Sequence, residues 1–131
     1  MNIKSNNIAI IPARGGSKRL ARKNIKPFSN QPMIYWTIQA AQKSRLFDCI
    51  LVSTDDEEIA QISRDNGAIV LLRPEDVSND EATLLDTLKH AIQSGYGSYD
   101  YMCLLLANCP LRNSKDIISS FDDYIQREPP A

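Results

Sequence analysis

The sequence predicts an α/β fold in which a doubly wound, mostly parallel sheet carries helices on both faces. Short runs rich in β-branched residues alternate with longer stretches of helical period, which is the pattern of βαβ units. Two of these runs, Ile8–Pro12 and Tyr101–Leu106, are apolar almost throughout, as expected of strands covered on both faces. With 43% hydrophobic and 24% charged residues, the composition is that of a globular domain.

The first half of the chain supplies two of the four predicted βα units. After strand Ile8–Pro12 and a loop, Pro32 suits the first turn of a helix. The second strand is Ile50–Ser53, and Thr54 or Asp55 can cap the helix that follows. The apolar stripes of the two helices consist of Ile34, Ile38 and Ala41, and of Ile59 and Ile62.

The second half supplies the other two units. A third strand, Ala68–Leu72, leads through a polar loop into a helix that is capped within residues 78–80 and ended at Gly95. The fourth strand, Tyr101–Leu106, precedes a helix capped by residue 113 or 114. The apolar stripes of these helices consist of Leu84 or Leu85, Leu88 and Ile92, and of Ile117, Ile118, Phe121 and Ile125.

Right-handed crossovers bring the carboxyl ends of parallel strands to one edge of a sheet, where open α/β folds bind their ligands. The loops expected at this edge are residues 13–29, 53–56, 73–82 and 107–114. The candidate ligand contacts therefore lie in these loops.

Charge is distributed unevenly along the chain, although the net charge is only -1. Residues 1–47 carry nine Lys and Arg and no acidic residue, whereas residues 48–131 carry six basic and sixteen acidic residues. The positive charge concentrates in the loop after the first strand. This loop favours an anionic ligand, while the acidic remainder argues against a nucleic-acid partner.

Several classes of protein are excluded by what the sequence lacks. No apolar run reaches the roughly 20 residues of a membrane-spanning helix, and Ile8–Ala13 is too short for the core of a secretory signal, so we expect a cytoplasmic protein without a membrane partner. The cysteines, Cys49, Cys103 and Cys109, form no Cys-x-x-Cys pair, and one histidine cannot complete a zinc set with them. Cys109 is expected to be non-catalytic because its only potential base, His90, falls in a predicted helix.

The strongest local motif is the basic loop Pro12-Ala13-Arg14-Gly15-Gly16-Ser17-Lys18, which extends to Lys23-Asn24. Its glycines let the backbone turn tightly and approach a ligand, Ser17 offers a hydroxyl, and five bases fall within ten residues, a combination that suits a polyphosphate. The loop lacks the Gly-Lys-Ser/Thr of a P-loop and the third glycine of the dinucleotide fingerprint. A solvated basic loop and a nucleic-acid patch are the alternatives that the spacing leaves open.

With four later motifs, this loop resembles the amino-terminal signature of the acylneuraminate cytidylyltransferases, which make CMP-activated sialic-type sugars. The later motifs are Val52-Ser53-Thr54-Asp55, Leu72-Arg73-Pro74, residues 78–83 and Cys109-Pro110-Leu111-Arg112. The resemblance covers nearly the whole chain, and its motifs are specific jointly. It implies a Rossmann-like fold of the nucleotide-diphospho-sugar transferase type.

The resemblance implies that the anomeric hydroxyl of a 2-keto-3-deoxy sugar acid attacks the α-phosphorus of CTP and that pyrophosphate leaves. The catalytic residues would be Lys23, at the α-phosphate, and Arg14, which with Lys18 would hold the departing pyrophosphate. Such residues fit the chemistry because phosphoryl transfer is catalysed mainly by positioning and by charge. The implied nucleotide-binding residues are Ala13, Arg14, Gly15, Gly16, Ser17, Lys18, Lys23, Asn24, Arg73 and Ser78.

On the sugar side the chain departs from the family pattern. Leu106 stands where relatives of this kind carry a glutamine, and it cannot form a hydrogen bond to a sugar. Asn108 and Arg112 are the remaining sugar-side candidates. The implied substrates are CTP, with Mg²⁺ to neutralise its triphosphate, and a nonulosonic acid. Activation of 3-deoxy-octulosonate or of a hexose phosphate is the related alternative.

Members of the resembled family typically continue beyond this length, with metal ligands, part of the sugar pocket and a dimerisation arm. We therefore expect residues 1–131 to form a single nucleotide-binding domain that corresponds to the amino-terminal portion. A non-catalytic nucleotide-binding module is the alternative. The sequence assigns no metal ligands, and a homodimer is one assembly that would protect an exposed edge of strand Tyr101–Leu106.

Three other residues have an ordinary structural interpretation beside the functional one. Asp55 either caps a helix or belongs to the family's Ser-Thr-Asp turn. Arg73 either contacts the ligand or pairs with Glu75. Trp36 is expected to pack against its neighbours rather than to stack on a base.

Overall fold

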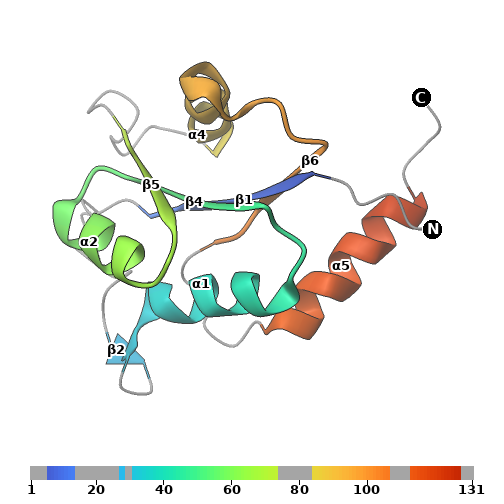
Figure 1. Ribbon diagram of the computed structural model, residues 1–131, viewed down its shortest axis with the longest axis horizontal. Helices are drawn as coiled ribbons and strands as arrows, with labels where there is room; N and C mark the ends of the chain where they lie inside the picture. Colours follow the sequence, from blue (N-terminus) through green and yellow to red (C-terminus); the bar gives the residue numbers. More distant parts are fainter. Residues whose placement is uncertain (1–5, 14–26, 29–30, 74–83, 107–112, 128–131) are drawn as a thin grey trace.

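The protein is built on a four-stranded parallel sheet in the order β5-β4-β1-β6 (Figure 1). A computed structural model describes residues 6–13, 27–28, 31–73, 84–106 and 113–127. The strands of the sheet are β1 (Asn7–Pro12), β4 (Cys49–Thr54), β5 (Ile69–Leu72) and β6 (Tyr101–Leu104). The predicted α/β class with a parallel sheet is confirmed.

Strand β1 lies in the middle of the sheet and pairs with β4 on one side and β6 on the other. Ile8 is level with Cys49 of β4 and with Met102 of β6. Every residue from Ile8 to Ile11 has no exposed surface. This full burial explains the unbroken apolar run of β1, because a strand covered on both faces has no side that tolerates polar residues.

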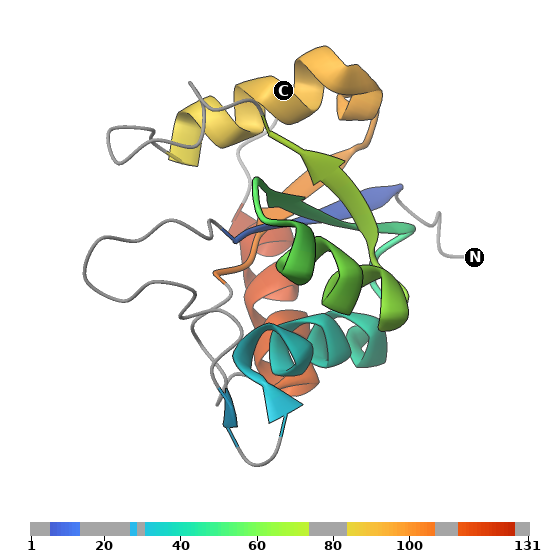
Figure 2. The same ribbon diagram turned by 90° about the vertical axis from the view of Figure 1, so that its left-hand side faces the viewer.

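Helices cover both faces of the sheet, as the sequence predicts (Figure 2). One face carries α1 (Met33–Ser44), α2 (Glu57–Asp65) and α5 (Ser114–Arg127), and the other carries α4 (Leu84–Ala91) with the wider turn η2 (Ile92–Tyr96). Alternate side chains of β1 enter two separate cores. Ala9 and Ile11 pack on the side of α1, whereas Ile8 and Ile10 pack on the side of α4.

The predicted cap of α2 at Thr54 or Asp55 is wrong, because Asp56 occupies the N-cap position. The Oδ1 atom of Asp56 accepts hydrogen bonds from the backbone N–H groups of Glu58 (2.8 Å) and Ile59 (3.1 Å). Thr54 is fully buried, and its Oγ1 accepts a hydrogen bond from the Asp56 N–H group at 3.1 Å. The chain thus turns once more after β4 before the helix begins.

The predicted apolar stripe of α4 is largely wrong. Leu84, Leu85 and Ile92 are about half exposed, whereas Thr87 and Ala91 are buried against the sheet. The row of the helix nearest the sheet carries these smaller side chains, which allow the helix to approach closely. The regular helical backbone is interrupted at Gly95, the predicted end, because Gly95 adopts φ 100° within η2.

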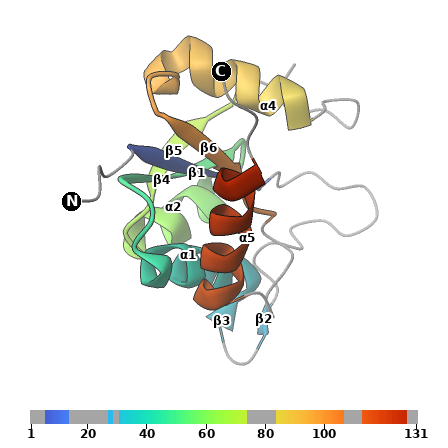
Figure 3. The ribbon, with the colours of Figure 1, turned by 90° about the vertical axis from the view of Figure 1, so that its right-hand side faces the viewer.

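Helix α5 starts as predicted and packs beside β6 (Figure 3). Asn113 accepts a hydrogen bond from the Asp116 N–H group at 2.9 Å, and the Asp116 carboxylate accepts one from the Asn113 N–H group at 3.2 Å. Phe121 is buried and meets the ring of Tyr101 edge-on, with 5.3 Å between centroids. This aromatic contact fixes α5 over β6, which is an edge strand of the sheet.

The sequence did not predict the short antiparallel pair β2 (Pro27–Phe28) and β3 (Gln31–Pro32), part of which falls in the expected basic loop. Strands of two residues are too short to show a periodic pattern. Five strand boundaries also differ by one or two residues. Strand β1 begins at residue 7 rather than 8, β4 spans residues 49–54 rather than 50–53, β5 begins at residue 69 rather than 68, and β6 ends at residue 104 rather than 106. Within the described ranges, no helix is long and apolar enough to cross a membrane.

Candidate functional site

The carboxyl ends of the strands form one continuous edge. Three backbone hydrogen bonds extend the ladder past the strand ends, each 2.9 Å long. They run from Ala13 N–H to the Ser53 carbonyl, from Arg73 N–H to the Thr54 carbonyl and from Leu105 N–H to the Ile10 carbonyl. The sheet thereby brings the residues that follow β1, β5 and β6 to the same edge of the molecule.

The order of the strands marks a particular place on this edge. The chain proceeds outward from β1 to β4 and β5, and then returns to the opposite side of β1 to form β6. The connections therefore diverge between β1 and β6. In open α/β sheets, a divergence of this kind leaves a crevice outside the carboxyl ends of the strands, which is where ligands bind.

Ala13 lies at the carboxyl end of β1, as predicted. Its side chain is buried in the core on the side of α1, and its N–H group is bound to the Ser53 carbonyl. A larger side chain at this position would displace that core. Because the side chain packs in the core, any contact of Ala13 with a nucleotide would involve its backbone.

Arg73 lies at the carboxyl end of β5 and is only 8% exposed. Its side chain extends to the face covered by α4, where NH1 donates a hydrogen bond to Oγ1 of Thr87 at 3.2 Å. A buried guanidinium is strongly unfavourable unless its donors are satisfied. The sequence offered Glu75 as an alternative partner for Arg73, and Glu75 lies outside the described residues.

Sequence reasoning missed Thr87, which is buried in α4 with 1% exposure. The signal was a polar residue one helical turn before Ala91, on the row that faces the sheet. The predicted sheet-facing stripe consisted instead of larger apolar residues of the same helical stretch, Leu84 or Leu85, Leu88 and Ile92. A single β-branched polar residue among leucines gives no indication of its partner when the partner lies fourteen residues earlier in sequence.

Ser53 is a second residue that sequence reasoning treated only as part of a motif. It is fully buried at the end of β4, and its hydroxyl has no hydrogen-bond partner among the described residues. Leu51 packs in the core on the side of α4, so the alternation along the strand directs Ser53 to the same face as Arg73. An unpartnered polar group thus lies at the ligand edge.

Most of the predicted site residues lie outside the described residues, so their roles stay predictions. These are Arg14, Gly15, Gly16, Ser17, Lys18, Lys23, Asn24, Ser78, Asn108 and Arg112. The described residues directly before the three segments concerned are Ala13, Arg73 and Leu106. All three follow the carboxyl ends of sheet strands.

Cys49 and Cys103 are free thiols, and burial raises the pKa of each. A hydrogen bond with Tyr99 lowers the pKa of Cys49, but burial is the larger effect. Neither group is therefore a ready nucleophile, because the reactive form is the thiolate. Cys109 lies outside the described residues. His90, the base considered for it, does lie in α4 as predicted.

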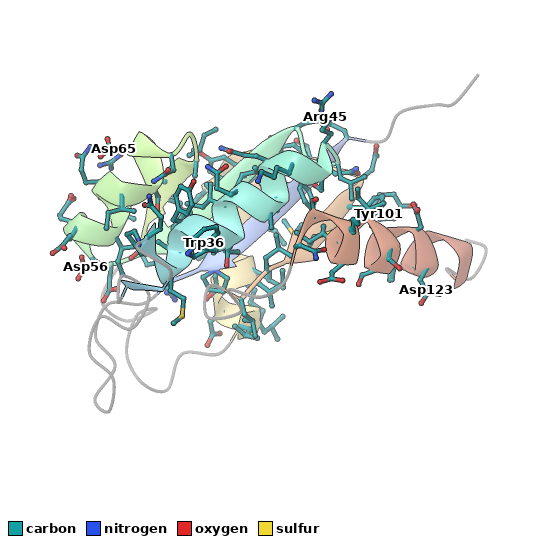
Figure 4. All side chains as sticks on the ribbon, turned by 90° about the horizontal axis from the view of Figure 1, so that it is seen from below. Trp36, Arg45, Asp56, Asp65, Tyr101 and Asp123 are labelled. Atoms are coloured by element: carbon teal, nitrogen blue, oxygen red, sulfur yellow. The ribbon has the colours of Figure 1, made fainter. Side chains whose placement is uncertain are left out.

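The remaining observations concern Trp36, which the sequence predicts to pack against its neighbours, and metal ligands, for which the sequence makes no assignment. Trp36 projects from α1 in Figure 4 and meets the ring of its neighbour Tyr35 edge-on, with 5.0 Å between centroids, as expected of a packing residue. In the part of the chain that the structure describes, no three His, Cys, Asp or Glu side chains gather in a way that could hold a metal ion.

Comparison with known proteins shows the family to which the chain belongs. The family model described as "Cytidylyltransferase" matches residues 8–126, nearly the whole chain. The chain belongs to the cytidylyltransferase family. The match extends from the first strand to the last helix, so both the central sheet and the ligand edge fall within it.

Two curated cytidylyltransferases illustrate the relationship. The chain is 40% identical over 126 residues to a pseudaminic acid cytidylyltransferase of Campylobacter jejuni, covering 93% of this chain and 54% of that protein. It is 41% identical over 117 residues to an N-acylneuraminate cytidylyltransferase of Escherichia coli, covering 89% of this chain and 28% of that protein. The chain thus spans about half, or less, of the length of these relatives.

Solved structures confirm the fold. A CMP:2-keto-3-deoxy-manno-octonic acid synthetase, solved in complex with CTP, superimposes with a TM-score of 0.79 at 23% identity and covers 94% of this chain and 48% of that one. A cytidylyltransferase from Leptospira borgpetersenii superimposes with a TM-score of 0.75, also at 23% identity, and covers 95% of this chain and 50% of that one. The cytidylyltransferase chain therefore has a nucleotidyltransferase α/β fold.

Proposed function

We propose that this chain is the nucleotide-binding portion of an enzyme that transfers CMP from CTP to the anomeric hydroxyl of a nonulosonic acid. The observation that carries the proposal is the placement of Ala13 and Arg73 on one ligand edge, in a chain that belongs to the cytidylyltransferase family. The two relatives are named for pseudaminic acid and N-acylneuraminic acid, and this supports a sugar acid of the same class.

The proposed reaction is a displacement at the α-phosphorus. The sugar hydroxyl oxygen forms a bond to phosphorus, the bond to the β-phosphate oxygen breaks, and pyrophosphate leaves while the hydroxyl proton is lost. Lys23 would stabilise charge on the α-phosphate oxygens, and Arg14 and Lys18 would stabilise the leaving pyrophosphate. Magnesium would enter as part of the Mg·CTP substrate.

The first test is a calorimetric titration of the chain with Mg·CTP, followed by a pyrophosphate-release assay with a panel of sugar acids. Binding with release would support the transferase and identify its substrate, whether a nonulosonic acid, 3-deoxy-octulosonate or a hexose phosphate. Binding without release would favour the non-catalytic nucleotide-binding module. Absence of CTP binding would contradict both.

The role of Lys23 is tested by Lys23→Ala. We expect pyrophosphate release to slow by about two orders of magnitude or more, because a positive charge that acts on the transferred phosphate is removed. Lys43→Ala is the matched control. Lys43 is an exposed lysine in the last turn of α1, and its substitution removes the same positive charge. Unchanged release by Lys23→Ala would overturn the assignment.

A further inference from the structure

Strand β6 ends the sheet and has one edge that no other described strand pairs. In the order β5-β4-β1-β6, it is bonded to β1 alone among the described strands. Edge strands are commonly protected from pairing with other chains by a charged residue or a proline, and β6 contains neither between Tyr101 and Leu104. All of its residues are half-buried, so the strand brings apolar surface to the rim of the sheet.

The edge of β6 borders a groove of about 360 Å³, and α5 lines the other side of it. Figure 3 shows the two elements beside each other. The groove is lined by Leu105, which packs on the side of α1, and by Met102 and Leu104, which pack on the side of α4. Because side chains directed to both faces of the sheet line it, the groove follows the outer edge of β6. A segment that pairs with β6 would therefore also contact α5.

Helix α5 presents a row of three residues to this groove, namely Asp116, Ser120 and Tyr124. Residues four apart lie on one face of a helix. All three are exposed, and Tyr124 remains 59% exposed although its ring meets that of Tyr101 edge-on, with 6.1 Å between centroids. The row therefore has a carboxylate acceptor at one end, a phenol donor at the other and a small side chain between them.

We propose that β6 and α5 form the interface of a homodimer, in which a second copy of the chain binds across a twofold axis at Ser120. Such an axis makes the two α5 helices antiparallel, so residues equally far from Ser120 face each other. Tyr124 of one copy then donates to the carboxylate of Asp116 of the other, and the contact occurs twice. The two β6 strands pair antiparallel and continue the sheet through both copies.

A second copy is the occupant that this row fits, because its two ends complement each other only when two such rows run in opposite directions. The inference does not depend on the proposed function, since neither β6 nor α5 has to bind a nucleotide for it. Light scattering after gel filtration tests it directly. At about 100 μM the unmodified chain should approach twice its mass of 14.7 kDa, and on dilution it should return to that mass.

Two consecutive serines of α5 supply a matched pair of variants. Ser120→Arg places two bulky like charges at the axis and should raise the Kd of the dimer at least about tenfold. Ser119→Arg makes the same change at an exposed residue that lines a separate groove of α5, and it should dimerise like the unmodified chain. Equal effects of the two substitutions would overturn the inference.

The contact at the ends of the row is tested by Tyr124→Phe, which removes the hydroxyl and keeps the ring. The Kd of the dimer should rise about tenfold, because a hydrogen bond to a charged group is lost twice. Hydrogen exchange locates the interface, since the amides of β6 should exchange more slowly at about 100 μM than at about 1 μM, while those of β1 stay unchanged. An unchanged Kd in Tyr124→Phe would overturn this pairing. A chain that stays monomeric at about 100 μM would overturn the homodimer and leave the groove to a different partner.

Discussion

At the scale of single residues, two buried side chains at the ligand edge differ in how their polar atoms are satisfied. Arg73 is bonded to Thr87, whereas the hydroxyl of Ser53 has no partner among the described residues. A buried hydroxyl without a hydrogen bond is unfavourable by about 1–3 kcal/mol. The sequence could identify both residues as parts of motifs, but it could not show that one is bonded and the other is not.

We therefore expect Ser53→Ala to leave the free energy of unfolding unchanged or to raise it by up to about 1 kcal/mol. The matched control is Ser44→Ala. Ser44 is also buried, but its hydroxyl donates to the Ala41 carbonyl at 2.6 Å, so its loss should lower the free energy of unfolding by about 1 kcal/mol. Urea denaturation measures both. A clear loss of stability in Ser53→Ala would show that its hydroxyl is satisfied in solution.

At the scale of elements, two helices on one face of the sheet end in left-handed backbone conformations. Helix α1 ends at Arg45, a non-glycine residue with φ 57°, which lies at the end of that helix in Figure 4. After α2, Gly67 adopts φ 90°. A Cβ atom added to Gly67 would lie 2.8 Å from Nε2 of Gln42, whose amide donates to the Asn66 carbonyl.

Substitutions at these two left-handed positions, Arg45 and Gly67, are expected to change the free energy of unfolding in opposite directions. Arg45→Gly should raise the free energy of unfolding by up to about 1 kcal/mol, because glycine adopts the left-handed conformation without steric penalty. Gly67→Ala should lower it by about 1–2 kcal/mol, since alanine is strained at positive φ and its methyl group would press on the Gln42 amide. Thermal unfolding of the two variants gives the comparison. Equal stability of both with the unmodified chain would contradict the left-handed conformations.

Periodicity predicted the elements better than it predicted their contacts. The stripe of α1 at Ile34, Ile38 and Ala41 is buried as predicted, because this helix lies against the sheet with α2 on one side and α5 on the other. The stripe of α4 is not, because α4 covers its face of the sheet without another described helix beside it. Apolar spacing shows which side of a helix can be buried, but neighbouring elements decide how much of it is.

At the scale of the whole molecule, the separation of charge along the chain remains its most distinctive feature of composition. Nine of the fifteen basic residues precede residue 48, and all sixteen acidic residues follow residue 47. In the described structure, acidic residues lie in the first turn of α2 at Glu57 and Glu58, where the helix dipole favours them. The basic residues between Arg14 and Lys26 follow the end of β1 in sequence, and they lie outside the described residues.

This arrangement predicts that nucleotide affinity depends on ionic strength. Raising NaCl from about 0.05 to 0.5 M should raise the Kd for Mg·CTP about tenfold or more, because salt screens the attraction between the basic segment and the triphosphate. Uncharged cytidine is the control, and its binding should change little over the same range. Calorimetric titration at four salt concentrations measures the slope. Equal salt dependence for CTP and cytidine would contradict a triphosphate site built on this segment.

The sequence by itself determined the parallel α/β class, the order of the principal strands and helices, and the motifs that indicate the family. These features are local, since they depend on residue periodicity and on short motifs. Only the tertiary structure decided the order β5-β4-β1-β6, the use of Asp56 as the cap of α2 and the bond between Arg73 and Thr87. These features depend on which segments meet in space, and burial and hydrogen bonding between distant segments leave no periodic signal in the chain.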